Sequence, residues 1–280
     1  TQMISSKTSL LGLIGNPVTH SLSPIMQNAA INHLELDFVY LALPCEIKNF
    51  ETVLNALKKV NCKGLNITIP FKEKAFELCN NMTSIAEKTK AINTLKLDNR
   101  GEWFGTNTDV EGFIYPLRKF NLRSKKATIL GSGGAARSAI QGLIDLGLSE
   151  INVISRNENS LKKIILDFEN QFKIKGLLAN NSSITKTIGD SNLVVNTTPV
   201  GMTAQKFDQQ NIPFGENCWK LLHKETIIYD LIYNPRETQL LQLSAKKGCS
   251  TIDGSEMLVA QGAKSLSFWT NELEIPIDVM

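Results

Sequence analysis

The stretch 125–147, KKATILGSGGAARSAIQGLIDLG, decides the fold of this chain. A short apolar strand runs into the glycine-rich turn 131–136, and a helical pattern follows directly. This is the strand–turn–helix setting of a dinucleotide-binding βαβ unit. Gly131 would make the tight turn, Gly133 would let a pyrophosphate approach the backbone, and Ala136 would allow close helix–sheet packing. We predict a dinucleotide site here, and the alternative is a glycine turn with no ligand.

The end of the next predicted strand, 151–154, is expected to select the cofactor. An NAD site places an acidic residue there for the ribose hydroxyls. Here the strand ends in Ser155-Arg156-Asn157, and Arg156 lies 25 residues after the first glycine. A guanidinium can hold a 2′-phosphate through bidentate, charge-assisted hydrogen bonds. We therefore expect NADP, with Glu158 as the acidic alternative that could serve a ribose and favour NAD.

Apolar runs alternate with helical patterns along nearly the whole chain, which implies βαβ units and parallel sheets covered on both faces. The predicted strands are 10–15, 37–43, 64–69, 127–130, 151–154, 193–196 and 226–231. The predicted helices are 24–33, 47–59, 110–119, 135–146, 161–172 and 256–269, with one more starting at Phe71.

Two breaks in composition divide the chain. GEWFGTNTD (101–109) is expected to be a turn-rich connection, and Asp253-Gly254 precedes the last predicted helix. We expect an α/β protein of two domains. The first spans residues 1–108 and is joined by the C-terminal helix segment 256–280, and the second spans residues 109–255.

The overall composition narrows the function classes. The chain has 280 residues, of which 42% are hydrophobic, and a formal net charge of +3 without a basic stripe, so a nucleic-acid partner is not expected. No apolar run approaches the length of a membrane span, and the N-terminus lacks the pattern of a signal peptide. The five cysteines form no CxxC pair and predict apolar packing in a reducing compartment. We expect a cytoplasmic protein without a metal or a membrane partner.

Polar residues follow the predicted strand 64–69. Asn66 and Thr68 share one face of that strand by its two-residue period, at the end where open α/β sheets bind ligands. Pro70 is expected to start the next helix, which places Lys72 in its first turn. The helix dipole disfavours a lysine there, so stability alone does not explain it. The alternative is an ordinary solvated lysine.

Two further polar residues lie beside apolar runs. Asn93 in AINTL (91–95) would be a buried amide that needs partners. Asp109 ends GTNTD (105–109) and could either cap the helix 110–119 or serve a site.

If the stretch HSLSP (20–24) is extended, Ser21 and Ser23 face the same side by the two-residue period. Ser23 before Pro24 is expected to be a helix N-cap, with the proline at the first helical position. Ser21 has no such local role. The two hydroxyls above a helix N-terminus would form a binding site for a carboxylate.

Together these segments resemble the shikimate dehydrogenase family. The resembling motifs occur in the family's order from residue 12 to about residue 269, and they are GNPVTHSLSP, NITIPFK, AINTL, GTNTD, GSGGAA, NTTPVGM, YDLIYNPRETQLL and DGSEMLVAQGAKS. The last two add Tyr233 and Gln261, which alone would be ordinary surface or packing residues. Eight ordered motifs are far more specific than any one of them.

The resemblance implies NADPH-dependent, reversible reduction of 3-dehydroshikimate to shikimate, a step of chorismate and aromatic amino acid biosynthesis. It implies an N-terminal substrate-binding domain with a mostly parallel sheet, a Rossmann-like NADP-binding domain, and an active site in the cleft between them. Lys72 and Asp109 would form the catalytic pair: the lysine would stabilise the oxyanion and exchange the proton, and the aspartate would orient it. The protein would be a monomer or a homodimer.

The resemblance also implies the binding residues. Shikimate would contact Ser21, Ser23, Asn66, Thr68, Asn93, Asp109, Tyr233 and Gln261. The cofactor would contact Gly131, Ser132, Gly133, Gly134, Ala135, Ala136, Ser155, Arg156, Asn157, Thr198, Val200, Gly201, Met202, Leu231 and Gly254.

One departure from the family bears on the cofactor. NADP-specific members often read Asn-Arg-Thr, with a further basic residue three positions later, whereas this chain has Ser155-Arg156-Asn157 and Ser160. Lys162 or Lys163 could compensate. The alternatives are an NAD-using quinate/shikimate dehydrogenase, a methylenetetrahydrofolate dehydrogenase, and a non-catalytic dinucleotide-binding regulator. The HSLSP and Gln261 motifs disfavour the second of these, and the intact Lys72 and Asp109 disfavour the third.

Overall fold

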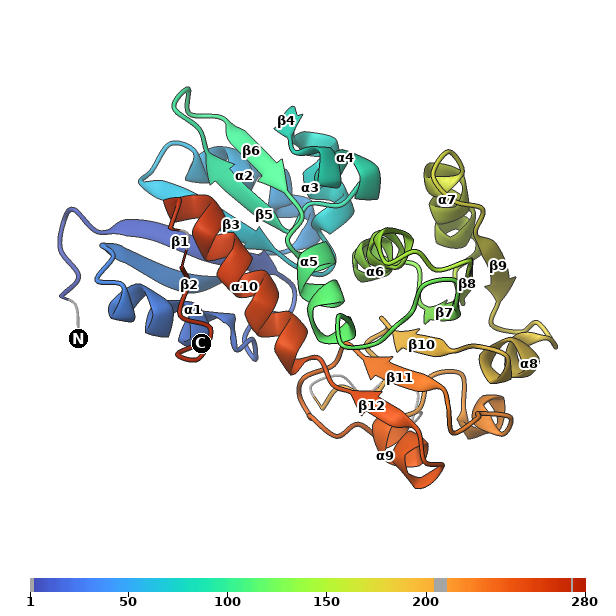
Figure 1. Ribbon diagram of the computed structural model, residues 1–280. Coiled ribbons are helices and arrows are strands. Elements are labelled where there is room, and N and C mark those ends of the chain that lie inside the picture. Colours follow the sequence, from blue (N-terminus) through green and yellow to red (C-terminus); the bar gives the residue numbers. More distant parts are fainter. Residues whose placement is uncertain (1–2, 204–210, 273) are drawn as a thin grey trace. The chain divides into compact units, whose positions relative to one another are not determined.

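The computed structural model describes residues 3–203, 211–272 and 274–280 (Figure 1). The chain divides into two compact units, Thr1–Gly112 with Val259–Met280, and Phe113–Leu258. Each unit has one six-stranded sheet with helices on both faces. The predicted α/β class with parallel-rich sheets is confirmed. Among the described residues, no helix is long and apolar enough to cross a membrane.

The first unit is built from β1 (Ser9–Gly15), α1 (Ser23–His33), β2 (Phe38–Pro44), η1 (Ile47–Asn49), α2 (Phe50–Leu57), β3 (Cys62–Ile67), α3 (Lys72–Leu78), β4 (Asn81–Met82), α4 (Ser84–Thr89), β5 (Thr94–Leu97) and β6 (Trp103–Thr106). The helices α5 (Asp109–Ile114) and α10 (Ser255–Thr270) each cross the boundary between the units.

The strand order of this sheet, β2-β1-β3-β5-β6-β4, sets the place of the site. Strands β1, β2 and β3 run parallel, whereas β5 is antiparallel to both β3 and β6. The carboxyl ends of β1, β3 and β6 therefore meet the start of β5 at one edge of the sheet. In open α/β sheets, ligands bind at this edge.

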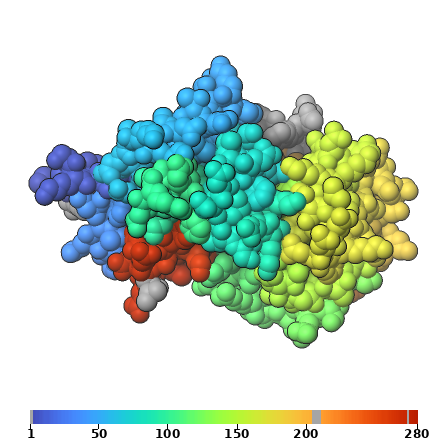
Figure 2. All heavy atoms as spheres, turned by 90° about the horizontal axis from the view of Figure 1, so that it is seen from above, coloured from blue at the N-terminus to red at the C-terminus, as the bar shows by residue number. Residues whose placement is uncertain are grey.

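Side chains of the first sheet alternate between two apolar layers. Leu11 and Leu13 pack with α1 and α10, whereas Leu65 and Ile67 pack with α2, α3 and α4. Figure 1 shows α10 lying along the first of these faces. The indole of Trp269 donates to the Leu95 carbonyl oxygen at 2.9 Å, which holds α10 on the sheet. Figure 2 shows the end of the chain in red against the green segment near residue 100.

The expected turn-rich connection at 101–109 is wrong for residues 103–106. Trp103–Thr106 form β6, paired with both β5 and β4. Gly105 lies in this strand, where a Cβ would come within 2.4 Å of Ile92 Cδ1. Close packing, and not a turn, requires the glycine.

The second unit contains η2 (Tyr115–Leu117), β7 (Lys126–Leu130), α6 (Gly134–Asp145), β8 (Glu150–Ser155), α7 (Glu158–Phe168), β9 (Lys175–Leu178), α8 (Ile184–Gly189), β10 (Leu193–Asn196), η3 (Glu216–Trp219), β11 (Ile227–Asp230), α9 (Gln239–Lys246) and β12 (Ser250–Ile252). All six strands are parallel, in the order β12-β11-β10-β7-β8-β9. This is the strand order of the Rossmann fold, with the switch point between β7 and β10.

A buried ion pair joins the first two helices of the second unit. Arg137 of α6, whose side chain is 1% exposed, lies 2.9 Å from the Asp167 carboxylate of α7. The pair links the helix after the glycine-rich turn to the helix after β8. The glycine-rich turn and the loop after β8 are therefore attached to helices that are held together.

Candidate active site

Lys72 and Asp109 form a close ion pair in the first unit. The Lys72 Nζ atom lies 2.6 Å from Asp109 Oδ2, and the two side chains are 13% and 8% exposed. Lys72 is the first residue of α3 and Asp109 the first residue of α5, so each follows a strand that ends at the ligand-binding edge. Charges this far from water are stable only when they are paired.

The interpretation of Asp109 as the N-cap of α5 is wrong. The Oδ1 atom of Asn107 accepts the backbone N–H groups of Asp109 and Val110, at 3.0 and 3.3 Å. Asn107 thus caps the helix. The Asp109 carboxylate is left to bind Lys72.

Packing around Lys72 fixes the start of α3. Pro70 lies in the turn before the helix and not inside it. Phe71 is buried and stacks on Phe50, with ring centroids 4.3 Å apart. The Lys72 carbonyl oxygen accepts the N–H of Ile92 at 2.9 Å, so the segment leading to Asn93 is bound to the same turn.

Asn66 and Asn93 are both buried and belong to one polar network. Asn66 Nδ2 lies near Thr94 Oγ1 and Ser265 Oγ, at 3.0 and 3.1 Å. Asn93 Nδ2 donates to Thr108 Oγ1 at 2.8 Å. The expectation that a buried Asn93 needs partners is confirmed.

At the start of α1, the serine that accepts a helix N–H is Ser21 and not Ser23. Helix α1 starts at Ser23, and Leu22 occupies the N-cap position. The Leu22 side chain makes no capping hydrogen bond. The Ser21 hydroxyl accepts the N–H of Ser23 at 3.2 Å. The prediction that Ser23 is the N-cap is therefore wrong, and Ser21 stabilises the helix start. The Ser23 hydroxyl has no hydrogen-bond partner among the described residues.

Thr68 lies directly after β3, beside the loop that carries the serines. Its N–H donates to the Ile14 carbonyl oxygen at 2.9 Å, and the N–H of Asn16 donates to the Ile69 carbonyl oxygen at 3.0 Å. A Cβ on Gly15 would come within 2.3 Å of the Thr68 methyl group. The glycine therefore allows the two loops to approach at the site edge.

Gln261 lies on α10, next to a close contact between helices. The Gln27 side chain of α1 donates to the Gly262 carbonyl oxygen at 2.9 Å, and a Cβ on Gly262 would come within 2.4 Å of Met26 Cε. The structure thus brings α10 against the helix that starts at Ser23. Tyr233 belongs to the second unit, where it follows β11 and is half-buried.

In the second unit, the glycine-rich turn is shaped for an anion. Gly131 has a φ of +106°, and a Cβ there would come within 2.5 Å of Thr197 Oγ1. Gly133 is the N-cap of α6, and a Cβ there would meet no atom within 4 Å. Open space beside free helix N–H groups suits a phosphate. Ala136 is fully buried, as expected for close helix–sheet packing.

Hydroxyl groups of three serines meet between the glycine-rich turn, the end of β8 and the start of α7. Ser132 Oγ lies 2.6 Å from Ser155 Oγ and 2.5 Å from Ser160 Oγ. Asn157 caps α7 by accepting the N–H of Ser160 at 2.9 Å. These contacts bind the glycine-rich turn to the end of β8.

The charged residues near this turn have distinct surroundings. Arg156 is exposed, and its guanidinium lies 5.8 Å from the ring centroid of Phe214. Glu158 and Lys162 form an ion pair with 2.6 Å between Nζ and Oε1, so each has the other as partner. The carboxylate of Glu158 is thus already engaged by a cation on the same helix.

The remaining predicted cofactor residues lie after β10, β11 and β12. The Thr198 hydroxyl donates to Asn196 Oδ1 at 2.7 Å, and Gly201 has a φ of +109°. A Cβ on Gly254 would come within 2.0 Å of the Leu231 carbonyl oxygen, so only glycine fits there. Val200 and Met202 lie in the same loop as Gly201.

Asp230, at the end of β11, is a fully buried carboxyl group that the sequence did not indicate as special. It accepts hydrogen bonds from Thr238 Oγ1 at 2.7 Å and from Asn196 Nδ2 at 3.0 Å. Burial raises the pKa of Asp230 to about 6 in spite of these bonds. Because Asp230 binds Asn196, the residue before Thr197, it stabilises the start of the loop that follows β10.

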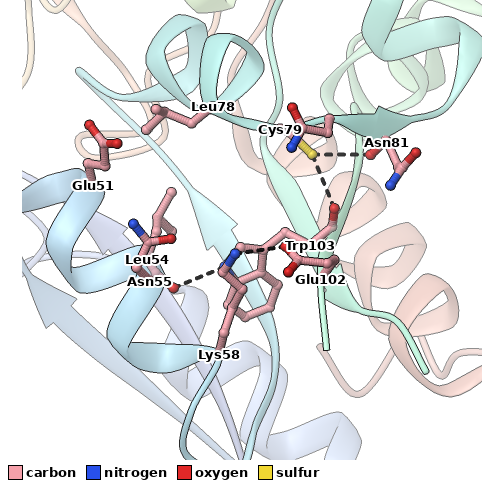
Figure 3. A pocket seen from close by; sticks show the side chains of 10 residues that line it. Glu51, Leu54, Asn55, Lys58, Leu78, Cys79, Asn81, Glu102 and Trp103 are labelled. Carbon is pink, nitrogen blue, oxygen red and sulfur yellow. Dashed lines mark hydrogen bonds and ion pairs between the residues drawn. The ribbon is translucent and has the colours of Figure 1, made fainter. Parts of the chain in front are cut away.

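A pocket elsewhere in the first unit has no part in this arrangement. Its cavity of about 100 Å³ is lined by residues of α2, the end of α3 and the start of β6 (Figure 3). Lys58 is paired with Glu102 at 2.8 Å, and the Cys79 thiol donates to two carbonyl oxygens. None of the predicted site residues lines it. Among the described residues, no group of three or more potential ligands could hold a metal ion.

Sequence reasoning missed Asn107, Ser265 and Asp230. All three lie inside quoted motifs, but Asn107 stands between two threonines and Ser265 follows Lys264, so no local pattern distinguishes these two residues. Asp230 had a signal, because it is a charged residue at the end of an apolar strand.

The fold and the site define a class of protein. A Rossmann-ordered sheet with a glycine-rich turn at its switch point, in a chain that also carries a buried lysine–aspartate pair, is typical of nicotinamide-dinucleotide oxidoreductases. Comparison with known proteins narrows this class. The family model for the shikimate dehydrogenase substrate binding domain matches residues 13–95.

Proteins that are similar to this chain over nearly its whole length are also named shikimate dehydrogenases. A shikimate dehydrogenase (NADP(+)) of Prochlorococcus marinus (strain MIT 9215) is 63% identical over 99% of this chain and 97% of its own length. The solved shikimate dehydrogenase of Aquifex aeolicus is 33% identical, with a TM-score of 0.87 over 99% of this chain and 97% of that one. Another, solved in complex with NADP+, is 31% identical, with a TM-score of 0.86 over 99% and 94%. The chain belongs to the shikimate dehydrogenase family.

Proposed function

We propose that the protein is an NADP-dependent shikimate dehydrogenase that reversibly reduces 3-dehydroshikimate to shikimate. The observation that carries the proposal is the Lys72–Asp109 pair, placed at the ligand-binding edge of the first sheet. The 63% identity to a relative that bears this name supports it.

The chemistry follows from the pair. Reduction of a ketone forms an alkoxide that must receive a proton, and a bound nicotinamide supplies the hydride. The Lys72 ammonium stabilises the developing negative charge and donates its proton to that oxygen. Asp109, 2.6 Å away, orients the ammonium group. In the oxidation direction, neutral Lys72 accepts the proton of the substrate hydroxyl.

Substrate binding is proposed for residues of the first unit and for Tyr233 of the second unit. Ser21, Ser23 and Tyr233 bind the carboxylate, and Thr68, Asn93, Asp109 and Gln261 bind hydroxyl oxygens. The unpartnered hydroxyls of Ser23 and Thr68, counted among the described residues, support these roles. The amide hydrogens of Asn66 already face acceptors within the protein.

The residues of the second unit fit an NADP molecule. The open side of Gly133 and the start of α6 would receive the pyrophosphate. Arg156, exposed over Phe214, would hold the 2′-phosphate through charge-assisted hydrogen bonds. The other residues proposed to line the cofactor are Gly131, Ser132, Gly134, Ala135, Ala136, Ser155, Asn157, Thr198, Val200, Gly201, Met202, Leu231 and Gly254.

The biological setting is also a proposal. The substrate-binding domain comprises residues 1–108 and 256–280, and the dinucleotide-binding domain comprises residues 109–255. The reaction belongs to chorismate and aromatic amino acid biosynthesis. A cytoplasmic location is supported by the five cysteines, all of which are free thiols.

Initial-rate measurements test the proposed function. Shikimate with NADP should give a rapid rise in the near-ultraviolet absorbance of NADPH, and quinate with NAD should give little. No reaction with shikimate would refute the proposal, and a faster reaction with quinate and NAD would identify the alternative enzyme.

A further inference from the structure

The backbone N–H of Thr108 fixes the orientation of the Asn93 side chain, because this group can only donate a hydrogen bond. The backbone N–H of Thr108 lies 2.8 Å from one amide atom of Asn93. A backbone N–H can only donate, so that atom is the oxygen, Oδ1. The other amide atom, 2.8 Å from Thr108 Oγ1, is therefore Nδ2.

The direction of the hydroxyl groups then follows around a closed ring. Asn93 Oδ1 can only accept, so the Thr94 hydroxyl donates to it at 3.0 Å. Ser265 Oγ, 2.8 Å from Thr94 Oγ1, must therefore donate to Thr94, and the Thr108 hydroxyl, 2.9 Å from Ser265 Oγ, must donate to Ser265. Thr108 Oγ1 in turn accepts from Asn93 Nδ2. Each hydroxyl donates once and accepts once within the ring.

Asn66 supports this ring from outside. The backbone carbonyl oxygen of Asn93 can only accept, and it lies 3.2 Å from Asn66 Nδ2. The two hydrogens of that atom also face Thr94 Oγ1 and Ser265 Oγ, and the Tyr40 hydroxyl donates to Asn66 Oδ1 at 2.8 Å. With both hydrogens engaged, Asn66 has no donor left for a ligand.

The ring leaves Asn93 with one group to offer. Its oxygen accepts from Thr94 and Thr108, and one hydrogen of Nδ2 is bound to Thr108. The second hydrogen has no partner among the described residues, although Asn93 is only 2% exposed. A buried donor without a partner costs about 1–3 kcal/mol. The site is therefore built for an oxygen atom that accepts this bond.

We propose that Thr94, Thr108 and Ser265 are positioning residues that lock the Asn93 amide so that it presents an N–H, and no oxygen, to the substrate. The inference rests on the proposed function. It predicts that the group facing Asn93 is a hydroxyl or keto oxygen, and that Asn66 acts through the ring instead of touching the substrate.

The ring is attached to both members of the catalytic pair. Thr108 precedes Asp109 in the chain, and the N–H of Ile92, next to Asn93, is bound to the Lys72 carbonyl oxygen. Ser265 comes from α10, which also carries Gln261. A loosened ring should therefore weaken substrate binding more than cofactor binding.

Two matched variants of Thr94 test the proposal. Thr94→Val keeps the shape and removes a hydroxyl that contacts Asn93, Asn66 and Ser265, whereas Thr94→Ser keeps the hydroxyl. Thr94→Val should raise the KM for shikimate about 10-fold, which corresponds to about 1.4 kcal/mol. The KM for NADP should stay within about 2-fold, and Thr94→Ser should remain near wild type. Ser265→Ala should repeat the effect of Thr94→Val from a different helix.

A control separates positioning from stability. Thr128 of the second unit is equally buried, and its hydroxyl lies 2.7 Å from Ser191 Oγ. Thr128→Val removes a buried hydroxyl outside the ring and should lower Tm by a similar amount without changing the KM for shikimate. If Thr94→Val and Thr128→Val changed that KM equally, the positioning role would be refuted.

Amide proton exchange measured by NMR in the free protein tests the ring without reference to activity. The Asn93 amide hydrogen bound to Thr108 should exchange more slowly than its geminal partner, and only the partner should shift on addition of shikimate. Equal exchange rates would overturn the ring. A wild-type enzyme inactive on shikimate but with unequal rates would refute the proposed function and leave the ring confirmed.

Discussion

Replacement of Lys72 by methionine separates chemistry from folding. Lys72→Met removes the group that exchanges the proton, and it leaves the Asp109 carboxylate, 8% exposed, without its cation. Loss of an acid–base group lowers turnover about 10²- to 10⁴-fold, and the lower limit corresponds to about 2.7 kcal/mol in the barrier. Breaking one side of a buried ion pair costs about 3–5 kcal/mol of stability.

The double variant Lys72→Met/Asp109→Leu distinguishes the two effects. Replacing a whole buried pair by apolar residues is often neutral or stabilising, so urea unfolding should show recovered stability. Turnover should stay at the low level of the single variant.

Lys74→Met is a matched control on the same helix. Lys74 pairs with Glu77 at 3.1 Å, and both side chains are about half exposed. Such a surface pair contributes about 0–1 kcal/mol, so stability and turnover should both be nearly unchanged. Recovery of turnover in the double variant, or near wild-type turnover in Lys72→Met, would refute the assignment.

Three further changes test other parts of the site. Ser21→Ala should raise the KM for shikimate. It should also lower the unfolding free energy by about 0.5–2 kcal/mol, and Tm with it, because Ser21 accepts the N–H of Ser23. An unchanged Tm would contradict this. Arg156→Ala should lower kcat/KM for NADPH much more than for NADH, and equal losses would show that Arg156 does not bind the 2′-phosphate. Burial raises the pKa of Asp230 to about 6, so the proton held by the native state stabilises it below about pH 4, and this stabilisation, about 3 kcal/mol, is lost as the pH rises through about 6. The Tm of the wild type minus that of Asp230→Asn should therefore fall between about pH 4 and pH 7, and a constant difference would contradict the raised pKa.

Much of the fold could be predicted because its signals are local. The strand before Gly131 and the helix after it are confirmed as β7 and α6. The predicted strand 10–15 and helix 24–33 agree with β1 and α1 to within one residue. Apolar alternation and a glycine-rich turn suffice for such elements, because both depend on neighbouring residues.

Elements that depend on distant partners could not be predicted in the same way. Residues of β6 contain glycine and polar groups typical of turns, and only pairing with β5 makes them a strand. The segment 81–82 forms β4 solely by pairing with β6.

The capping residues show the same limit at the site. Asn107 and Asp109 are both favoured N-caps, and so are Ser21 and Ser23. The path of the backbone decides which of two neighbours accepts the helix N–H groups. The sequence pattern names the candidate residues, whereas the division between capping and binding depends on the folded chain.

Transfer of a labelled hydride tests the central claim most directly. NADPH carrying deuterium at both positions of the nicotinamide C4 would be mixed with 3-dehydroshikimate and the wild-type enzyme. The product, analysed by mass spectrometry and NMR, should be shikimate with one deuterium on the carbon that was the ketone. Oxidation of NADPH without deuterated shikimate would contradict the account.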